Sequence, residues 1–70
     1  MKKLQSNMSG TVFKLLVKVG DNVAQGQDII ILESMKMEMM VPSLYAGKVK
    51  EIFVKIDDFV EEGQDLVALE

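Results

Sequence analysis

One lysine lies at the centre of the segment that could do chemistry. Lys36 stands between two methionines in the run Glu33-Ser34-Met35-Lys36-Met37-Glu38. Its ε-amine is a compact nucleophile on a long flexible stem, and in its neutral form it can attack an activated carbonyl. Lysine is also common on protein surfaces, so Lys36 could simply be a solvated residue at a loop tip. The residue types alone leave both interpretations open.

The neighbours of Lys36 allow two further interpretations. Glu33 and Glu38 could form a carboxylate pair for acid–base catalysis, but so short a chain has little room for a cleft and offers no histidine as partner. We therefore expect these carboxylates to lie on a solvated face. The nearby methionines could fill the core or bind copper as soft ligands, and the absence of cysteine and histidine argues against copper. These methionines are Met35, Met37, Met39 and Met40.

The chain on either side of this segment is a repeat. Residues 9–33 and 46–70 align at an offset of 37 and share 11 identities over 25 positions without a gap. Such self-similarity indicates two copies of one supersecondary unit that share a core. Residues 34–37 lie between the copies and are predicted to form a hairpin. The identical pairs include Gly10/Gly47, Val12/Val49, Asp21/Asp58, Val23/Val60, Gly26/Gly63 and Gln27/Gln64.

Composition limits the class of protein. The 70 residues make a single domain, and the lack of cysteine and histidine excludes disulfides and the common zinc sites. A net charge of −3 argues against nucleic-acid binding, which would need a basic surface. No apolar run is long enough for a membrane span, and the N-terminal residues are too polar for a signal peptide. The absence of cysteine fits a cytoplasmic protein.

The pattern along the chain predicts an all-β fold. β-Branched and apolar residues dominate residues 11–19, as is typical of a strand. Val12 fits one alternation of inward-facing positions, whereas Leu15, Val17 and Val19 fit the other. A bulge near Phe13-Lys14 is therefore expected. Residues 29–32 form a short apolar run typical of a buried strand, and residues 37–41 continue extended to an edge or corner at Pro42. Turns are expected at 20–22 and 25–27, and residues 1–7 are expected to fray.

Two copies of about four strands each would bury one core face to face. The sequence therefore predicts a flattened β-barrel or sandwich of two four-stranded antiparallel sheets with a pseudo-two-fold axis. Lys36 is expected near this axis at one end, with the start of the first copy and the end of the second together at the other. Met35 and Lys36 would form the corner of a tight hairpin, where Asn-Gly would be easier, and such local misfits often mark functional sites.

The segment around Lys36 resembles the attachment motif of the biotinyl/lipoyl family, commonly Glu-Ala-Met-Lys-Met-Glu. Residues 8–12 are similar to the family's Met-Pro-Gly-Thr-Val, and residues 19–23 and 26–27 match its two turns. The resemblance covers nearly the whole chain and is nearest to small bacterial biotin/lipoyl attachment proteins and biotin carboxyl carrier domains. Ser9, Ser34 and Asp57 replace the family's usual Pro, Ala and Gly, and the turn at Asp57 is expected to differ in backbone. The thumb of some acetyl-CoA carboxylase carriers has no counterpart.

The resemblance implies a biotin carboxyl carrier that is not itself catalytic. Lys36 would carry covalent biotin, Met35 and Met37 would be recognised by the ligase and partners, and Glu33, Ser34 and Glu38 would support that recognition. The implied partners are biotin protein ligase and the biotin carboxylase and carboxyltransferase subunits or domains, between whose sites carboxybiotin is shuttled. No nucleic acid or membrane is implied.

Two alternatives stay open. Lipoyl domains have the same fold and usually read Glu-x-Asp-Lys-Ala, so lipoate on Lys36 is the first alternative. Glu33 is shared by both patterns, whereas Met35 and Met37 match the biotinyl pattern on both sides of the lysine. The second alternative is an unmodified structural or interaction module in which Lys36 is only a solvated tip.

Overall fold

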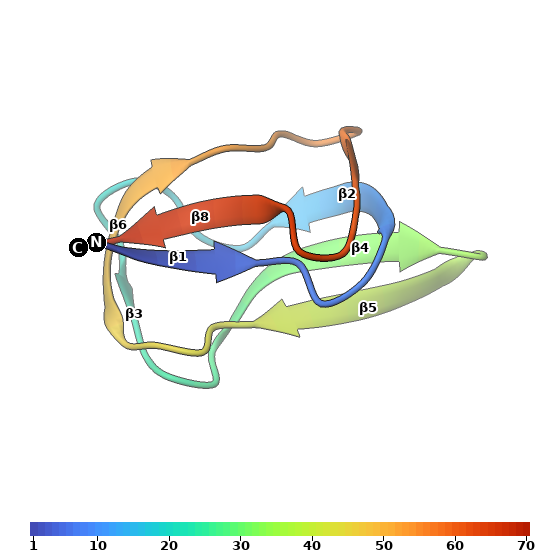
Figure 1. The fold of residues 1–70 in the computed structure, drawn as a ribbon. Helices are drawn as coiled ribbons and strands as arrows, with labels where there is room; N and C mark the ends of the chain where they lie inside the picture. The colour runs from blue at the N-terminus through green and yellow to red at the C-terminus, as the bar shows by residue number, and fades with distance from the viewer.

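The computed structural model describes residues 1–70 and contains eight strands and no helix (Figure 1). There is accordingly no helix that could span a membrane. The strands are β1 (Lys2–Gln5), β2 (Gly10–Leu15), β3 (Asn22–Val23), β4 (Asp28–Ser34), β5 (Met37–Pro42), β6 (Gly47–Ile52), β7 (Phe59–Val60) and β8 (Asp65–Leu69).

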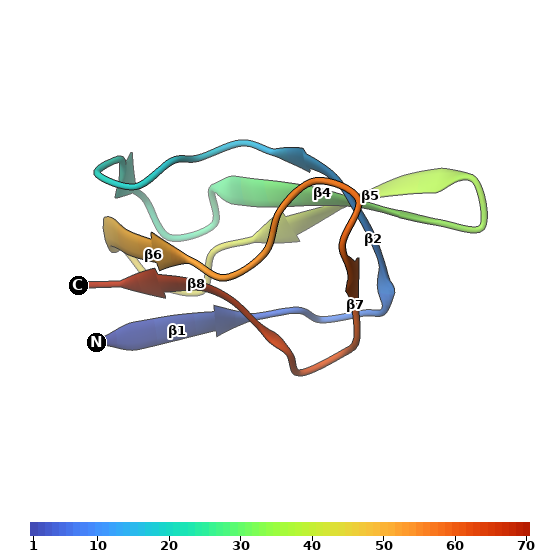
Figure 2. The ribbon, with the colours of Figure 1, turned by 90° about the horizontal axis from the view of Figure 1, so that it is seen from above.

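The strands form two four-stranded antiparallel sheets, ordered β1-β8-β6-β3 and β5-β4-β2-β7. Figure 2 shows β1 and β8 in one layer and β4 and β5 in the other. Each half of the chain gives strands to both sheets: β3 lies beside β6, and β7 lies beside β2. The predicted all-β architecture of two sheets is confirmed, as is the exchange of strands between them.

Hydrogen bonds that cross between the halves occur in symmetric pairs. The Val12 amide donates to the Asp58 carbonyl and the Val49 amide donates to the Asp21 carbonyl, each at 2.8 Å. The Ser6 amide likewise donates to the Gln64 carbonyl at 2.9 Å, as the amide of Ser43 does to the carbonyl of Gln27 at 2.8 Å. Every one of these pairs is related by 37 positions. The two halves are therefore structural copies about a pseudo-two-fold axis.

The side chains shared by the two copies close the turns. Asp21 Oδ2 accepts a bond from the Lys18 amide at 2.9 Å, and Asp58 Oδ2 accepts one from the Lys55 amide at 3.0 Å. In the second turn of each copy, the glutamine side chain accepts a bond from the amide three residues earlier. Asp and Gln recur because their oxygens satisfy backbone donors that the turns leave free.

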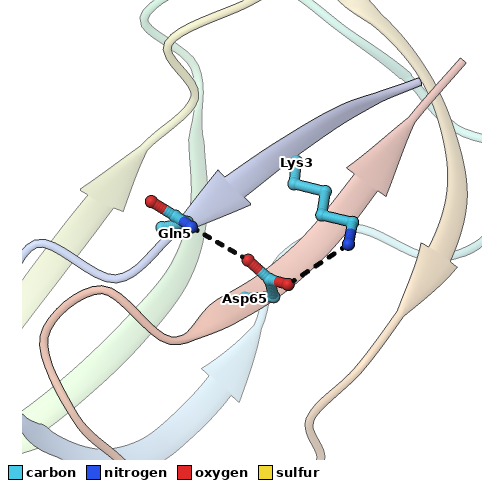
Figure 3. A network of polar contacts seen from close by, with 3 residues as sticks. All are labelled: Lys3, Gln5 and Asp65. Carbon is cyan, nitrogen blue, oxygen red and sulfur yellow. Dashed lines mark hydrogen bonds and ion pairs between the residues drawn. The ribbon is translucent and has the colours of Figure 1, made fainter.

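The structural repeat extends beyond the sequence repeat, and the expected fraying of residues 1–7 is wrong. Lys2–Gln5 form β1, which pairs with β8, and Leu4 is only 2% exposed. Asp65 on β8 forms an ion pair with Lys3 at 3.5 Å and accepts a hydrogen bond from Gln5 at 3.1 Å (Figure 3). At the offset of 37, β1 corresponds to the second part of β5. Few identities mark this correspondence, so the sequence pattern did not reveal it.

The core lies between the sheets and consists of aliphatic side chains from both copies. The bulge expected near Phe13-Lys14 is present, because the register of β2 against β4 shifts between Val12 and Lys14. Val19 was expected inside but is 60% exposed, because β2 ends at Leu15 and the chain turns away before it. The main buried residues are Leu4, Val12, Val17, Val23, Ile29, Ile30, Leu32, Val41, Val49, Val54, Val60, Leu66, Val67 and Leu69.

The molecule is elongated, with Cα extents of 32 × 19 × 18 Å. Both chain ends lie at one end and the β4–β5 hairpin projects at the other (Figure 1). The expected position of Lys36 near the axis is wrong, because the symmetry maps Glu33 near the hairpin onto Glu70 at the opposite end. The axis therefore crosses the molecule between its ends. The first copy likewise starts at the hairpin end, since Thr11 pairs with Glu33.

The turn at Asp57 was expected to differ in backbone from the turn at Gly20, and this expectation is wrong. Asp57 adopts a φ of 79°, in the same left-handed region as Gly20 at 98°. A left-handed φ costs a residue with a Cβ about 1–2 kcal/mol, less for Asp than for most, whereas glycine adopts it freely.

We expect Asp57→Gly to raise the free energy of unfolding by about 0.5–1 kcal/mol, because relief of this strain exceeds the greater chain entropy of glycine. Urea denaturation measures the change. As the matched control, Gly20→Ala should lower stability, since a Cβ there meets nothing within 4 Å and only the backbone angle is penalised. A less stable Asp57→Gly variant would contradict this account.

Candidate functional site

The β4–β5 hairpin carries Lys36 at its tip. Ser34 pairs with Met37, so the turn consists of Met35 and Lys36 alone. Both residues have positive φ, 52° and 63°, as a type I′ hairpin turn requires. This turn type matches the right-handed twist of the strands, and here two residues with a Cβ adopt it in place of the usual Asn-Gly. The predicted tight hairpin at these two corner residues is confirmed.

The side chains of the tip point into solvent. Met35 is 91% exposed and Met37 is 61% exposed, and Lys36 is also exposed. The one ion pair of the structure joins Lys3 to Asp65, so Lys36 has no carboxylate partner. None of the hairpin methionines belongs to the core cluster, and the interpretation of Met35, Met37, Met39 and Met40 as core filler is therefore wrong. The arrangement presents a single amine flanked by two thioethers.

Glu33 and Glu38 are direct cross-strand neighbours at the base of this tip. Their strands pair in register and both residues are exposed, as expected for a solvated face. The surface has no pocket, and no group of three or more acidic side chains is placed to bind a metal ion. The carboxylate pair therefore lies on an open, solvated surface.

Like charges directly opposite on neighbouring strands destabilise a sheet. We therefore expect Glu38→Gln to raise the free energy of unfolding by about 0.2–1 kcal/mol, because it removes the repulsion without changing side-chain size. The gain should shrink at high salt, which screens exposed charges. Thermal or urea unfolding at two salt concentrations measures both effects. Equal stability of the variant and the parent at low salt would show that the repulsion is negligible.

Gly10 supports the base of the hairpin. A Cβ on this residue would lie 2.9 Å from the Glu33 carbonyl oxygen, so only glycine lets β2 approach the end of β4 so closely. Gly47 is placed in the same way against Glu70, with a distance of 3.0 Å. The identity of these two glycines was visible in the sequence repeat, but its reason was not, because the close approach joins strands distant in sequence. Sequence reasoning also missed the exposure of Met39 and Met40, at 39% and 52%.

The structure brings all six residues of the predicted site onto one projecting hairpin. It offers an exposed amine at the tip, with two carboxylates at the base of the hairpin and no pocket around them. Lys36 is thus open to contact by another protein from every side of the tip.

Comparison with known proteins agrees with this geometry. The family model Biotin_lipoyl, described as biotin-requiring enzyme, matches residues 2–69. A biotin carboxyl carrier protein of Streptococcus mutans is 50% identical over 40 residues, which are 57% of this chain and 31% of that protein. A biotin/lipoyl attachment protein of Bacillus subtilis is 50% identical over 34 residues, 49% of this chain and 47% of that protein. The chain thus spans less than half the length of either relative.

Solved structures share the fold. The urea carboxylase of Kluyveromyces lactis superposes with a TM-score of 0.90 at 38% identity, covering 99% of this chain and 6% of that one. Because the family model spans nearly every residue, the chain belongs to the biotin/lipoyl attachment family.

Proposed function

We propose that this chain is a biotin carboxyl carrier, modified on Lys36 and without catalytic activity of its own. The observation that carries the proposal is the isolated, exposed amine at the tip of a two-residue turn that projects from a rigid barrel. A ligase must find this amine in one place, and a hairpin fixed by strand pairing holds it there. The named relatives support biotin, because one is a biotin carboxyl carrier protein and another is the carboxyltransferase 1.3S subunit of Propionibacterium freudenreichii.

Lipoate on the same lysine is the alternative, and the name of the Bacillus subtilis relative includes both groups. The two methionines beside Lys36 favour biotin, because the lipoyl pattern places Asp and Ala there. An unmodified module is disfavoured by the turn itself. Met35 and Lys36 both hold positive φ at a cost that Asn-Gly would avoid, and such local strain is typical of functional sites.

The attachment reaction follows from the exposed amine. In its neutral form, the Lys36 nitrogen attacks the carbonyl carbon of an acyl-adenylate held by the ligase. A C–N bond forms, the C–O bond to phosphate breaks, AMP leaves with the electron pair, and the nitrogen loses a proton. The amide is neutral, so the lysine charge is lost. When bound, biotin supplies a ureido ring that accepts a carboxyl group at one active site and releases it at another.

The lysine stem and its acyl chain together make an arm of about ten single bonds, with a reach on the order of 10–15 Å. Both chain ends lie at the opposite end of the barrel from this arm (Figure 1). Attachment to a larger enzyme through either end would therefore leave the hairpin free. Tethering would hold the arm at high effective concentration for a biotin carboxylase and a carboxyltransferase, which we propose as partners. A cytoplasmic location stays a prediction.

We assign ligase and partner recognition to the residues around the amine. Met35 and Met37 would offer apolar, adaptable contact surface on either side of Lys36. Glu33 and Glu38 would offer acidic contacts at the hairpin base, and Ser34 lies between the turn and the barrel. The repulsion between the two glutamates gives the folded chain no benefit. Their pairing on an exposed face would suit contact with basic groups of a partner.

The proposal is tested by offering the purified chain to two ligases in parallel. Biotin protein ligase with biotin and ATP should add one biotinyl group per chain, whereas lipoate ligase with lipoate and ATP should label it poorly. Intact-mass spectrometry reads both reactions. Preferential lipoylation would favour the alternative carrier. Failure of both reactions on the folded chain would support an unmodified module.

A further inference from the structure

Exposed methionines are concentrated on the hairpin. Met35, Met37, Met39 and Met40 fall within six positions and are 91%, 61%, 39% and 52% exposed. The fold does not require methionine at these positions: Met35 and Met37 lie outside the core cluster, and the positions equivalent to Met39 and Met40, at the offset of 37, are Lys2 and Lys3 on β1. Packing therefore explains neither their number nor their position.

The thioethers are also the reactive sulfur atoms of this chain, which has no cysteine. An exposed methionine is oxidised to the sulfoxide, which is polar and chiral and can be reduced again enzymatically. The two most exposed sulfur-bearing residues of the hairpin flank Lys36 directly. We propose that Met35 and Met37 are oxidation sites for peroxides, and that their oxidation slows acylation of Lys36. The second part rests on the proposed function.

The oxidation step is complete with a peroxide as the only co-reactant. The thioether sulfur attacks one peroxide oxygen, the O–O bond breaks, and an S–O bond forms. The sulfur loses two electrons, and the transferred oxygen gives up its proton through water to the remaining oxygen, which leaves as water or alcohol. No base or metal from the protein is needed, so exposure sets the order in which methionines react.

Oxidation of the two methionines would change how the ligase recognises Lys36. A sulfoxide replaces an apolar flexible surface on each side of the amine with a strongly hydrated dipole. The amine itself and the core are untouched, because Met35 and Met37 lie outside the core cluster. Reactivity toward a small acylating reagent should therefore persist while the ligase reaction slows. Oxidation of Met35 and Met37 would thus lower the rate at which Lys36 is biotinylated under oxidative conditions, and reduction of the sulfoxides would restore that rate.

The first measurement maps oxidation by dilute hydrogen peroxide. Peptide mass spectrometry over time should show Met35 and Met37 converted before Met8, which is half-buried against the core and serves as internal reference. Met1, which is 71% exposed and lies at the opposite end from the hairpin, should be converted in the same period as the tip methionines. Circular dichroism and the urea midpoint should be unchanged at that stage. Faster oxidation of Met8, or unfolding that accompanies oxidation of the tip, would overturn the site assignment.

The second measurement compares ligase rates before and after this treatment. We expect biotinylation to slow about tenfold, equal to about 1.4 kcal/mol of lost recognition. Labelling of Lys36 by a small N-hydroxysuccinimide ester should be unchanged, and methionine sulfoxide reductases should restore the ligase rate. The double variant Met35→Leu/Met37→Leu should be biotinylated at the same rate before and after peroxide treatment. An unchanged rate in the oxidised parent overturns the switch, whereas no biotinylation of the untreated parent instead overturns the proposed function.

Discussion

Replacement of Lys36 by arginine is expected to abolish biotinylation completely. Arginine stays protonated at every accessible pH, so its guanidinium cannot act as the neutral nucleophile that the acyl-adenylate requires. Arginine is unbranched at Cβ like lysine and tolerates the φ of 63° equally well, so the hairpin should keep its shape. Coexpression with a biotin ligase, followed by intact-mass spectrometry, measures the loss.

Matched substitutions separate this effect from a general loss of charge. Lys14→Arg and Lys55→Arg change exposed lysines outside the hairpin and should leave one biotinyl group per chain. Unchanged urea midpoints for all three variants would show that the fold is intact. A biotin adduct that survives in Lys36→Arg would disprove the site.

Truncation of Leu32 is expected to have the largest effect on stability. Leu32 is fully buried on β4 and lies between Val12 and Met39 on the neighbouring strands, directly beneath the hairpin. Leu→Ala in a core usually costs about 2–5 kcal/mol, through lost apolar burial and the cavity that remains. A domain of this size is stabilised by only about 4–10 kcal/mol. Urea denaturation should therefore show a variant that has lost a large part of its stability.

Met35→Ala is the contrasting substitution in the same strand pair. Its side chain is 91% exposed, and surface substitutions usually change stability by less than about 0.5 kcal/mol. The variant should fold normally but be biotinylated more slowly if Met35 is recognised by the ligase. Should Met35→Ala unfold the chain while Leu32→Ala leaves it stable, the placement of the hairpin relative to the core would be wrong.

The sequence repeat predicted most of the architecture because its identities fall where backbone geometry is most demanding. Asp21 and Asp58 recur because each closes a turn by a side-chain hydrogen bond, and Gly26 and Gly63 because each has a φ of 87°. From these few positions the two copies, their turns and the exchange of strands could be inferred.

The missed features depend on contacts between distant parts of the chain. β1 is held by pairing with β8, which local polarity in residues 1–7 cannot show. Val19 has the β-propensity of a strand residue, but the chain leaves the sheet before reaching it. Asp57 takes a glycine-like φ because the surrounding turn and its hydrogen bonds impose that angle. In each case tertiary structure overrides local preference.

The hairpin turn was easier to predict than the position of the symmetry axis. Met35 and Lys36 were recognisable as a hairpin corner because they lie between two copies of known length. The position of the axis required the pairing of Thr11 with Glu33, which places the start of the first copy beside the hairpin. The sequence alone does not specify how the first copy is oriented relative to the second.

The central claim is that Lys36 carries biotin, and intact-mass analysis of the chain isolated from its native host tests it most directly. Peptide mapping by tandem mass spectrometry then locates any added group. The account predicts one biotinyl group, located on the peptide that contains Lys36, and no other acyl modification. A lipoyl group on Lys36, biotin on a different lysine, or an unmodified chain from cells with an active biotin ligase would contradict it.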